Sequence, residues 1–333
     1  MKKILNDPAK FVDESLEGIV AAHPCMLRAL EEDGRAIVRK DAPVQGKVAI
    51  ATGGGYGHLP VFMGYVGEGL ADGCAVGNVF SSPSADTMLE VAKAIDGGKG
   101  VLFLYGNYFG DKMNFDYAAE MAAEDEHIRV ESVRVCDDAA SAPKEEKQKR
   151  RGVAGIFFAY KIAGACAASG ADLDKVRAMA EKTIDNMATM GIGFTPCVIP
   201  ASGQPSFEIP DDEIGVGIGI HGEPGISQEK MAPSKELVTR ILDKLKEDLE
   251  LEKGQEIALL FNGLGSTSLE ELYLGYKDAK AYLDELGVRV YRPYVGEYAT
   301  SLEMGGFSIT ILKLDEELKA YLDAPAKSPF FMQ

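Results

Sequence analysis

The first half of the chain alternates short apolar segments with longer amphipathic ones, and this alternation constrains the fold more than any other feature. The apolar segments at 46–52, 100–108 and 128–138 have the length and aliphatic content of buried strands. The segments 84–95 and 114–126 between them have the length and apolar spacing of helices. Strands separated by helices of this length form parallel βαβ units, so we predict a doubly wound α/β fold for this half.

Two consecutive helices are predicted after these units. They cover the segments 152–170 and 172–190. Gly170 is placed to end the first helix, because glycine readily adopts the left-handed conformation that follows a helix. Asp172 is placed to cap the second, because its carboxylate can accept hydrogen bonds from the first free N–H groups.

The character of the sequence changes at about residue 191. The segment 191–207 is rich in glycine and proline and indicates a crossing into a second unit. We therefore expect a larger α/β first domain, 1–190, followed by a smaller α+β second domain, 191–333. The second domain is predicted to hold an antiparallel or mixed sheet with helices on one face. Its expected elements are helices at 234–251 and 269–287 and strands at 256–264 and 307–315.

Composition argues against several classes of partner and site. The net charge of −17 disfavours nucleic acid and anionic membranes, and the basic run at 144–152 is interpreted as a solvated loop or helix start. Five widely spaced cysteines without a CxxC pair argue against a zinc site or a disulfide framework and indicate reduced thiols in the cytoplasm. No apolar run approaches the ~18 residues that a membrane span requires, so no membrane partner is expected.

Two of the four histidines lie in glycine-rich loops. His58 belongs to "ATGGGYGHLP" and His221 to "GVGIGIHGEPG". The first loop follows a predicted strand, and its glycines would let backbone N–H groups approach a ligand oxygen closely. It matches neither a Walker A loop nor the GxGxxG of dinucleotide folds. A tight turn, or a turn histidine bonded to a backbone carbonyl, would also account for these loops without a ligand.

Asp111 follows another predicted strand directly, just before a predicted helix. It is either a helix cap or a carboxylate that binds a hydroxyl group and acts as a general base. Ligand sites in open α/β sheets collect at the carboxyl ends of strands, where both Asp111 and His58 are expected. A neutral imidazole can add to a ketone carbonyl, and a second histidine with a carboxylate could then manage the hydroxyl protons.

Eight stretches, spread over nearly the whole chain, resemble the dihydroxyacetone kinase family. Within that family the resemblance is to the dihydroxyacetone-binding subunit or to a close paralogue of this subunit. The order and density of these stretches carry the resemblance. They are "KKILNDP", "GKVAIATGGGYGH", "GYVGEGLADGCAVGNVFSSPSADTM", "GNYFGDKMNF", "RRGVAG", "GVGIGIHGEPG", "NGLGSTSLEELY" and "EYATSLEMGGFSITILKLD".

The resemblance implies a role for each candidate residue. His221 would bind the ketone carbonyl covalently as a hemiaminal, which would separate ketones from polyols such as glycerol. His58 would bond a substrate oxygen and assist proton movement, and Asp111 would activate the hydroxyl that is phosphorylated. Gly54 and Gly55 would contact the substrate through their backbone groups.

The sequence departs from the family pattern around these loops. Tyr56 replaces a serine, Leu59 a glutamate, Phe109 a threonine, and Gly106 a lysine that helps to hold the substrate. We expect Tyr56 and Gly106 to border the substrate and to reshape the pocket. The substrate could then be dihydroxyacetone or another short ketose such as erythrulose. Alternatively, the chain could be a non-catalytic paralogue that senses the ketone and acts on a transcription regulator.

The resemblance also implies partners. The phosphoryl group would come from a separate nucleotide-bearing subunit that holds ADP or ATP with magnesium, in a phosphotransferase-system-dependent or ATP-dependent kinase. This chain itself is expected to hold no cofactor and no metal. Family members are homodimers, so the same is expected here.

Overall fold

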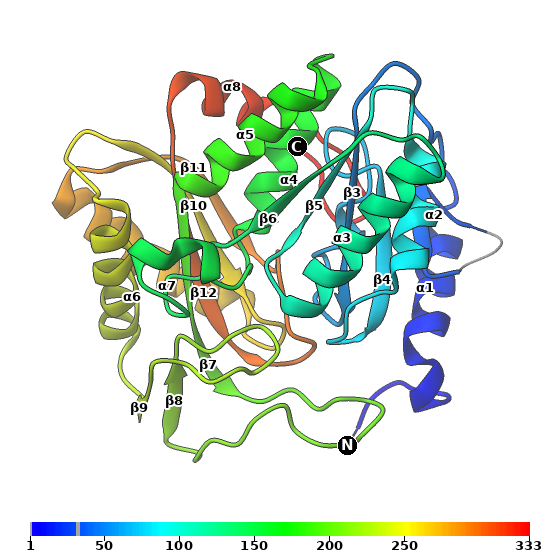
Figure 1. Ribbon diagram of the computed structural model, residues 1–333. Helices are drawn as coiled ribbons and strands as arrows, with labels where there is room; N and C mark the ends of the chain where they lie inside the picture. Colours follow the sequence, from blue (N-terminus) through cyan, green and yellow to red (C-terminus); the bar gives the residue numbers. More distant parts are fainter. Residues whose placement is uncertain (1, 31–33) are drawn as a thin grey trace.

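The computed structural model of the protein describes residues 2–30 and 34–333 and contains two six-stranded sheets with helices between and outside them (Figure 1). The first sheet has the strand order β1-β2-β4-β3-β5-β6. Strands β3 to β6 run parallel to one another, whereas β1 and β2 form an antiparallel edge. The bounds are Leu27–Ala29 (β1), Ala36–Arg39 (β2), Ala49–Tyr56 (β3), Gly73–Val79 (β4), Val101–Gly106 (β5) and Val130–Val135 (β6).

Helices cover both faces of the first sheet, as a doubly wound fold requires. Alternate residues of β5 point to opposite faces. Phe103 and Tyr105 pack on Phe115 of α3, whereas Leu102 and Leu104 belong to the cluster around α4. The α/β prediction for this half is therefore confirmed. The helices are Phe11–Ala22 (α1), Ala85–Ile95 (α2), Phe109–Glu124 (α3), Ile156–Ala168 (α4) and Leu173–Asp185 (α5), with short 3-10 turns at Pro8–Lys10, Met63–Tyr65 and Lys144–Lys149.

The second sheet is mixed and has the order β11-β10-β12-β7-β8-β9, with one parallel pair, β10 and β11. Residues Ile257 and Leu259 of β10 pack toward α6 and α7 on its outer face. The bounds are Met187–Thr195 (β7), Glu213–Val216 (β8), Ser227–Lys230 (β9), Ser234–Leu249 (α6), Glu256–Gly263 (β10), Leu269–Leu286 (α7), Arg289–Gly296 (β11), Gly305–Lys313 (β12) and Glu316–Asp323 (α8).

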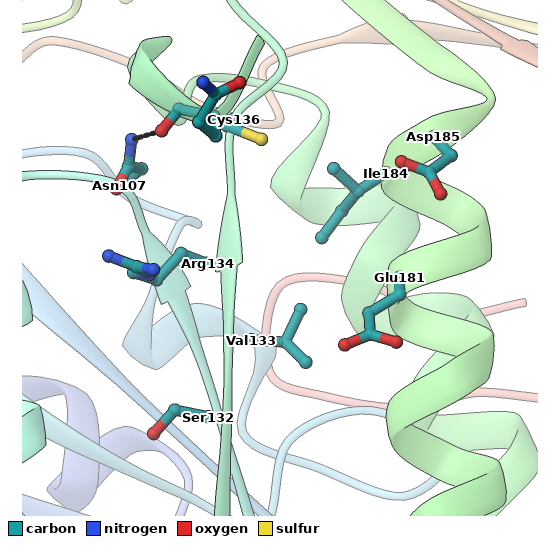
Figure 2. Close-up of a pocket in the computed structure, with 9 residues that line it drawn as sticks. Asn107, Ser132, Val133, Arg134, Cys136, Glu181, Ile184 and Asp185 are labelled. Carbon is teal, nitrogen blue, oxygen red and sulfur yellow. Dashed lines mark hydrogen bonds between the residues drawn. The ribbon is translucent and has the colours of Figure 1, made fainter. Parts of the chain in front are cut away.

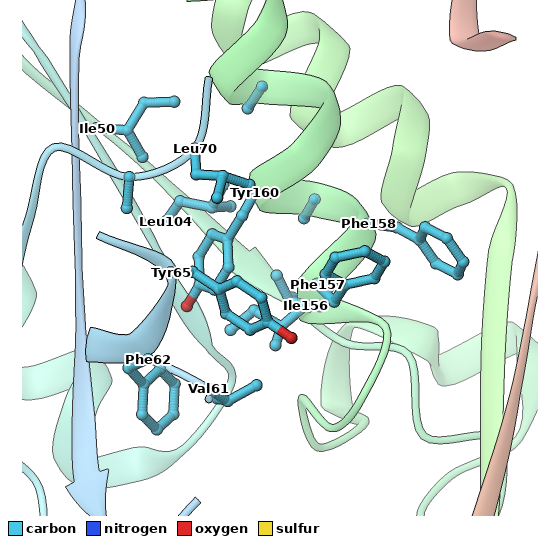
Figure 3. Packing of buried hydrophobic residues seen from close by; sticks show 14 of the residues in the cluster. Ile50, Val61, Phe62, Tyr65, Leu70, Leu104, Ile156, Phe157, Phe158 and Tyr160 are labelled. Carbon is cyan, nitrogen blue, oxygen red and sulfur yellow. The ribbon is translucent and has the colours of Figure 1, made fainter. Parts of the chain in front are cut away.

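The layer formed by α4 and α5 lies between the two sheets and is shared by them (Figure 1). Every residue of α4 from Ile156 to Ala167 is buried, and all but a few of these side chains are apolar. The one charged residue, Lys161, donates to the backbone carbonyls of Tyr321 and Ala324. Figure 3 shows Phe157 and Tyr160 of this helix packed with Tyr65 from the first unit. Phe157 also meets Tyr294 of β11, at 5.0 Å between ring centroids. The hydrophobic core therefore runs continuously through both units.

The structure corrects the end of the second predicted helix. Gly170 has a positive φ and Asp172 caps α5, as predicted, but the helix ends at Asp185 and residues 187–190 begin β7. Local helix-forming residues are overridden there because β7 pairs along its length with β12. The expected boundary at 190/191 thus falls inside a strand of the second sheet.

The basic run at 144–152 is only partly solvated, which corrects a second expectation. Arg150 is fully buried, and its guanidinium donates to both carboxylate oxygens of Asp248 in α6, one of them at 2.8 Å. A buried arginine needs such a partner, and the partner lies 98 residues away in the sequence. No helix in the described part of the chain is long and apolar enough to span a bilayer.

Candidate functional site

His58 lies just beyond β3, and its ring is completely buried. Its Nδ1 is 2.8 Å from the backbone carbonyl of Thr300. A carbonyl only accepts hydrogen bonds, so Nδ1 carries the proton and Nε2 keeps its lone pair. Nε2 has no hydrogen-bond partner among the described residues. Burial, and next the neighbouring His221, lower the pKa of His58 to about 3, so its ring is neutral near pH 7.

His221 lies in the loop of residues 217–226 between β8 and β9, which we call the His221 loop. Glu223 holds it twice: one carboxylate oxygen is 2.9 Å from Nδ1 of the ring, and the other accepts the backbone N–H of His221 at 2.9 Å. Burial would raise the pKa of Glu223, but His221 and Arg151 outweigh it and lower that pKa to about 2. The ionised carboxylate can only accept, so Nδ1 is the donor and Nε2 of a neutral ring is a free nucleophile.

The fold brings these two imidazoles together although 163 positions separate them in the sequence (221 − 58). Their ring centroids lie 4.8 Å apart in an edge-to-face arrangement. Phe80 stacks on His58 at 5.0 Å and meets His221 at 5.3 Å. The ring of Tyr108 meets that of His221 edge to face, at 4.8 Å between centroids. The neutral ring of His58 and the ring of His221 thus share one aromatic-walled site.

Asp111 joins this site from the first turn of α3. It is not the helix cap, because Tyr108 occupies that position. Its side chain is buried, and its Oδ1 finds no hydrogen-bond partner within residues 2–30 and 34–333. Burial raises the pKa of Asp111 to about 6, against the opposing effects of Ser82 and of the nearby His221. A carboxylate with this pKa near a nucleophile is suited to take a proton from a substrate hydroxyl.

Comparison with known proteins identifies the family. A family profile described as the Dak1 domain matches residues 17–330. The chain belongs to the Dak1 domain family. The PTS-dependent dihydroxyacetone kinase 2, dihydroxyacetone-binding subunit DhaK, of Listeria innocua is 45% identical over 99% of both chains. The D-erythrulose kinase of Mycolicibacterium smegmatis is 41% identical over 99% of this chain and 56% of that longer protein.

A solved structure has the same fold as this Dak1 domain. It is the dihydroxyacetone kinase operon co-activator Dha-DhaQ, with a TM-score of 0.87 and 32% identity. The match covers 94% of this chain and 96% of that one. The family therefore includes proteins named as kinases and a protein named as a co-activator.

Gly54 and Gly55, near the end of β3, allow close packing around His58. A side chain on Gly54 would meet the ring of Phe62 at 2.3 Å. A side chain on Gly55 would lie 2.6 Å from the backbone nitrogen of Ser81, next to Phe80. The absence of side chains on these two glycines therefore lets Phe62 and the backbone at Phe80 pack directly against β3, and Phe80 in turn stacks on His58.

Two predicted site residues are not in direct contact with the imidazoles. Tyr56 packs its ring on Phe11 at 6.0 Å and hydrogen-bonds with Ser15, both in α1. A Cβ atom added to Gly106 would lie 3.3 Å from the ring of Tyr108. Gly106 therefore borders the site through Tyr108, whereas the contacts of Tyr56 are with the first helix.

Sequence reasoning missed three groups that shape the site: Glu223, Tyr108 and Phe80. The available signal for Glu223 was its position two residues after His221, from which a carboxylate can reach back to Nδ1. Tyr108 and Phe80 gave no signal of this kind, because an aromatic residue near a strand end is usually part of the core. Their position beside the imidazoles follows from the packing of loops from different strands.

The structure also has a cavity of about 210 Å³ beside β6 and α5 (Figure 2). It is separate from the site, since neither histidine nor Asp111 lines it. Asn107, which lines the cavity, directly precedes Tyr108, and its side chain donates to the carbonyl of Arg150 at 2.7 Å. The described residues contain no cluster of three or more His, Cys, Asp or Glu side chains that could hold a metal ion. The cavity is lined by Asn107, Ser132, Val133, Arg134, Cys136, Gln148, Glu181, Ile184 and Asp185.

Proposed function

We propose that the protein is the substrate-binding subunit of a dihydroxyacetone kinase, which holds a short ketose on His221 for phosphoryl transfer. One observation carries this proposal: Glu223 fixes Nδ1 of His221 and leaves Nε2 as a nucleophile, 4.8 Å between ring centroids from the neutral His58. The dihydroxyacetone-binding subunit of Listeria innocua, 45% identical over 99% of both chains, supports the substrate class.

The covalent step adds the imidazole across the ketone carbonyl. The lone pair of Nε2 forms a bond to the carbonyl carbon, and the π electrons of the C=O bond move to its oxygen. The ring then passes its Nδ1 proton by way of Glu223 to water, and the alkoxide oxygen takes one proton from water, so that in net one proton moves from the ring to the new hydroxyl group. No atom leaves, so the product is a neutral hemiaminal. A polyol such as glycerol offers no carbonyl carbon and is excluded.

The phosphoryl step uses Asp111 and His58. Asp111 accepts the proton of a terminal substrate hydroxyl, and Nε2 of His58 accepts a hydrogen bond from the substrate and shares the proton movement. The attacking oxygen would then form a bond to the terminal phosphorus of an ATP held by the partner subunit, in line with the breaking bond to ADP, which would leave. Holding the ketose covalently keeps this oxygen in place, which compensates for the few contacts that so small a substrate can make.

The nucleotide, ADP or ATP with magnesium, would be carried by a separate subunit in the cytoplasm, and this chain would act as a homodimer.

An exposed apolar row on α3 supports a docking surface for that subunit beside the site. Phe109, Met113 and Tyr117 follow one another at intervals of four residues and are 80%, 56% and 58% exposed. Residues at this spacing share one helix face, and Asp111 lies in the same first turn as Phe109. A phosphoryl donor covering this row would lie beside the helix turn that carries Asp111, whose buried side chain is on the other side of the helix.

Two alternatives remain within this proposal. Erythrulose is the second candidate substrate, favoured by the 41% identity to a D-erythrulose kinase and by the absence of a side chain at Gly106 beside Tyr108. A ketone sensor that acts on a transcription regulator is the second candidate function, favoured by the similarity to Dha-DhaQ. The presence of His58 and Asp111 favours catalysis, since a sensor needs only the covalent histidine.

Intact-protein mass spectrometry under native conditions tests the covalent site. The protein is incubated with dihydroxyacetone, erythrulose or glycerol, and His221→Ala is compared with wild type. We expect a gain of one whole ketose mass in wild type, none with glycerol, and none in the variant. His127→Ala, which removes an exposed histidine, is the matched control and should keep the adduct. The absence of a gain with either ketose, or its persistence in His221→Ala, would contradict the proposal.

Turnover with a partner then separates kinase from sensor. The nucleotide-bearing subunit of a dihydroxyacetone kinase is added together with its phosphoryl donor. A kinase subunit forms ketose phosphate, and Asp111→Ala stops this while the adduct still forms. A sensor forms the adduct but gives no product with any donor subunit.

A further inference from the structure

The carboxyl end of β6 continues into two adjacent aspartates that organise the segment before α4. Asp137 is completely buried and accepts the backbone N–H groups of Val153 and Gly155, each at 2.8 Å. The hydroxyl of Thr189 in β7 donates to the same carboxylate at 2.5 Å. These three hydrogen bonds fix the course of residues 151–155 relative to both sheets.

Asp138 holds the side chain of Arg151 at the start of this segment. Its carboxylate is buried and accepts from Nε of Arg151 at 2.8 Å, and the same oxygen forms an ion pair with Nη2 at 2.7 Å. The hydroxyl of Ser141 accepts the backbone N–H of Arg151 at 3.0 Å. The guanidinium plane is therefore fixed by the first unit of the fold.

The remaining donors of Arg151 face the His221 loop of the second unit. Nη2 donates to the carbonyl of Gly217, the first residue of that loop, at 3.1 Å. Nη1 lies 3.9 Å from the carboxylate oxygen of Glu223 that also accepts the backbone N–H of His221. A side chain on Gly219 would approach both the guanidinium, at 2.6 Å, and the carboxylate, at 2.1 Å. Glycine at this position leaves the space in which the two charged groups meet.

We propose that Arg151, held by Asp138, is a positioning residue for the covalent step: it holds Glu223 in place so that Nδ1 of His221 keeps its proton and Nε2 keeps its lone pair. This inference rests on the proposed function for its catalytic meaning. Arg151 acts through Glu223 and does not touch the ketose. It also joins a carboxylate from the first unit to the loop that carries the nucleophile in the second.

The positive charge of Arg151 matters as well as its geometry. A cation beside the carboxylate favours its ionised form, and only an ionised carboxylate is restricted to accepting hydrogen bonds. An uncharged residue at position 151 would leave Glu223 free to move or to take up a proton. His221 would then also adopt the tautomer that carries the proton on Nε2. In that tautomer Nε2 has no free lone pair with which to attack the ketone.

The test measures the imidazole tautomer and the adduct separately. Nitrogen-15 NMR of the His221 ring in ketose-free protein reports the tautomer, and native mass spectrometry with a ketose titration reports the adduct. The variants are Arg151→Gln, Arg151→Lys and the double variant Asp138→Asn with Arg151→Gln. The double variant also removes the carboxylate that Arg151→Gln alone would leave buried without its cation. Arg129→Gln, at the opposite end of β6 on the surface, is the matched control.

We expect the double variant to fold and to lose the dominance of the Nδ1–H tautomer. The ketose concentration for half-occupancy should rise by about 10-fold, as the loss of one charge-assisted contact implies. Arg151→Lys should recover part of this because it restores the charge, and Arg129→Gln should match wild type. A folded double variant with the wild-type tautomer and adduct would overturn the inference. Failure of wild type to form any adduct would instead refute the proposed function, while the ketose-free tautomer measurement would still decide the role of Arg151.

Discussion

Replacement of Glu223 by alanine should weaken the ketose adduct more than any other change that leaves His221 in place. The substitution removes both 2.9 Å hydrogen bonds to His221, one to the ring and one to its backbone N–H. A hydrogen bond to a charged group contributes about 1.5–3 kcal/mol, and Glu223 is partly exposed, so we expect a loss of about 2 kcal/mol in total. At 1.4 kcal/mol per tenfold change, the adduct dissociation constant should rise about 30-fold.

Native mass spectrometry with a ketose titration measures this change. Glu223→Gln keeps an oxygen that can accept from Nδ1 but loses the charge, so it should fall between wild type and Glu223→Ala. Glu208→Ala removes an exposed glutamate from the preceding loop and should have no effect. Adduct affinity in Glu223→Ala within about twofold of wild type would refute the argument that Glu223 orients the nucleophile.

The pH dependence of this contribution follows from the lowered pKa of Glu223. Its folded value of about 2 lies below the ordinary value of 4.5. The stabilisation from the ionised carboxylate is therefore complete above about pH 4.5 and is lost as the pH falls toward 2. Acid unfolding curves of wild type and Glu223→Gln should converge at the low end of this window.

Three further predictions concern other parts of the molecule. Asp111→Asn should abolish turnover yet raise the unfolding temperature above pH 6, because burial raises the pKa of Asp111 to about 6 and its ionised form is unfavourable in the fold; an unchanged or lower temperature would contradict this. Arg150→Met should lower the free energy of unfolding, measured with urea, by about 3–5 kcal/mol, because it leaves Asp248 without its buried partner. A decrease of less than about 1 kcal/mol would contradict the importance of this ion pair. Phe109→Asp should weaken binding of the nucleotide-bearing subunit, measured by calorimetry, with the adduct unaffected; equal affinity would place docking elsewhere.

Much of the fold was predictable because local patterns and tertiary packing agree. In the first half, the predicted strands and intervening helices appear where the sequence placed them. The clearest case is β5, which is buried on both faces and shows an uninterrupted apolar run. The prediction failed at Met187, where helix-forming residues lie in β7 because the chain pairs with β12. It failed again at Arg150, whose buried partner Asp248 comes from a helix that no local pattern connects to it.

For the site, the sequence alone determined which chemical groups are present and that glycine-rich loops carry His58 and His221. Glycine near a strand end is a local signal, because it is required wherever backbone and side chains must approach closely. Only the tertiary structure decided that the two rings meet at 4.8 Å, that Glu223 binds Nδ1, and that Tyr56 packs on the first helix instead of on the imidazoles. These contacts depend on how two sheets pack around one shared helical layer, and the relative position of two sheets is set by the whole core and by no short stretch of sequence.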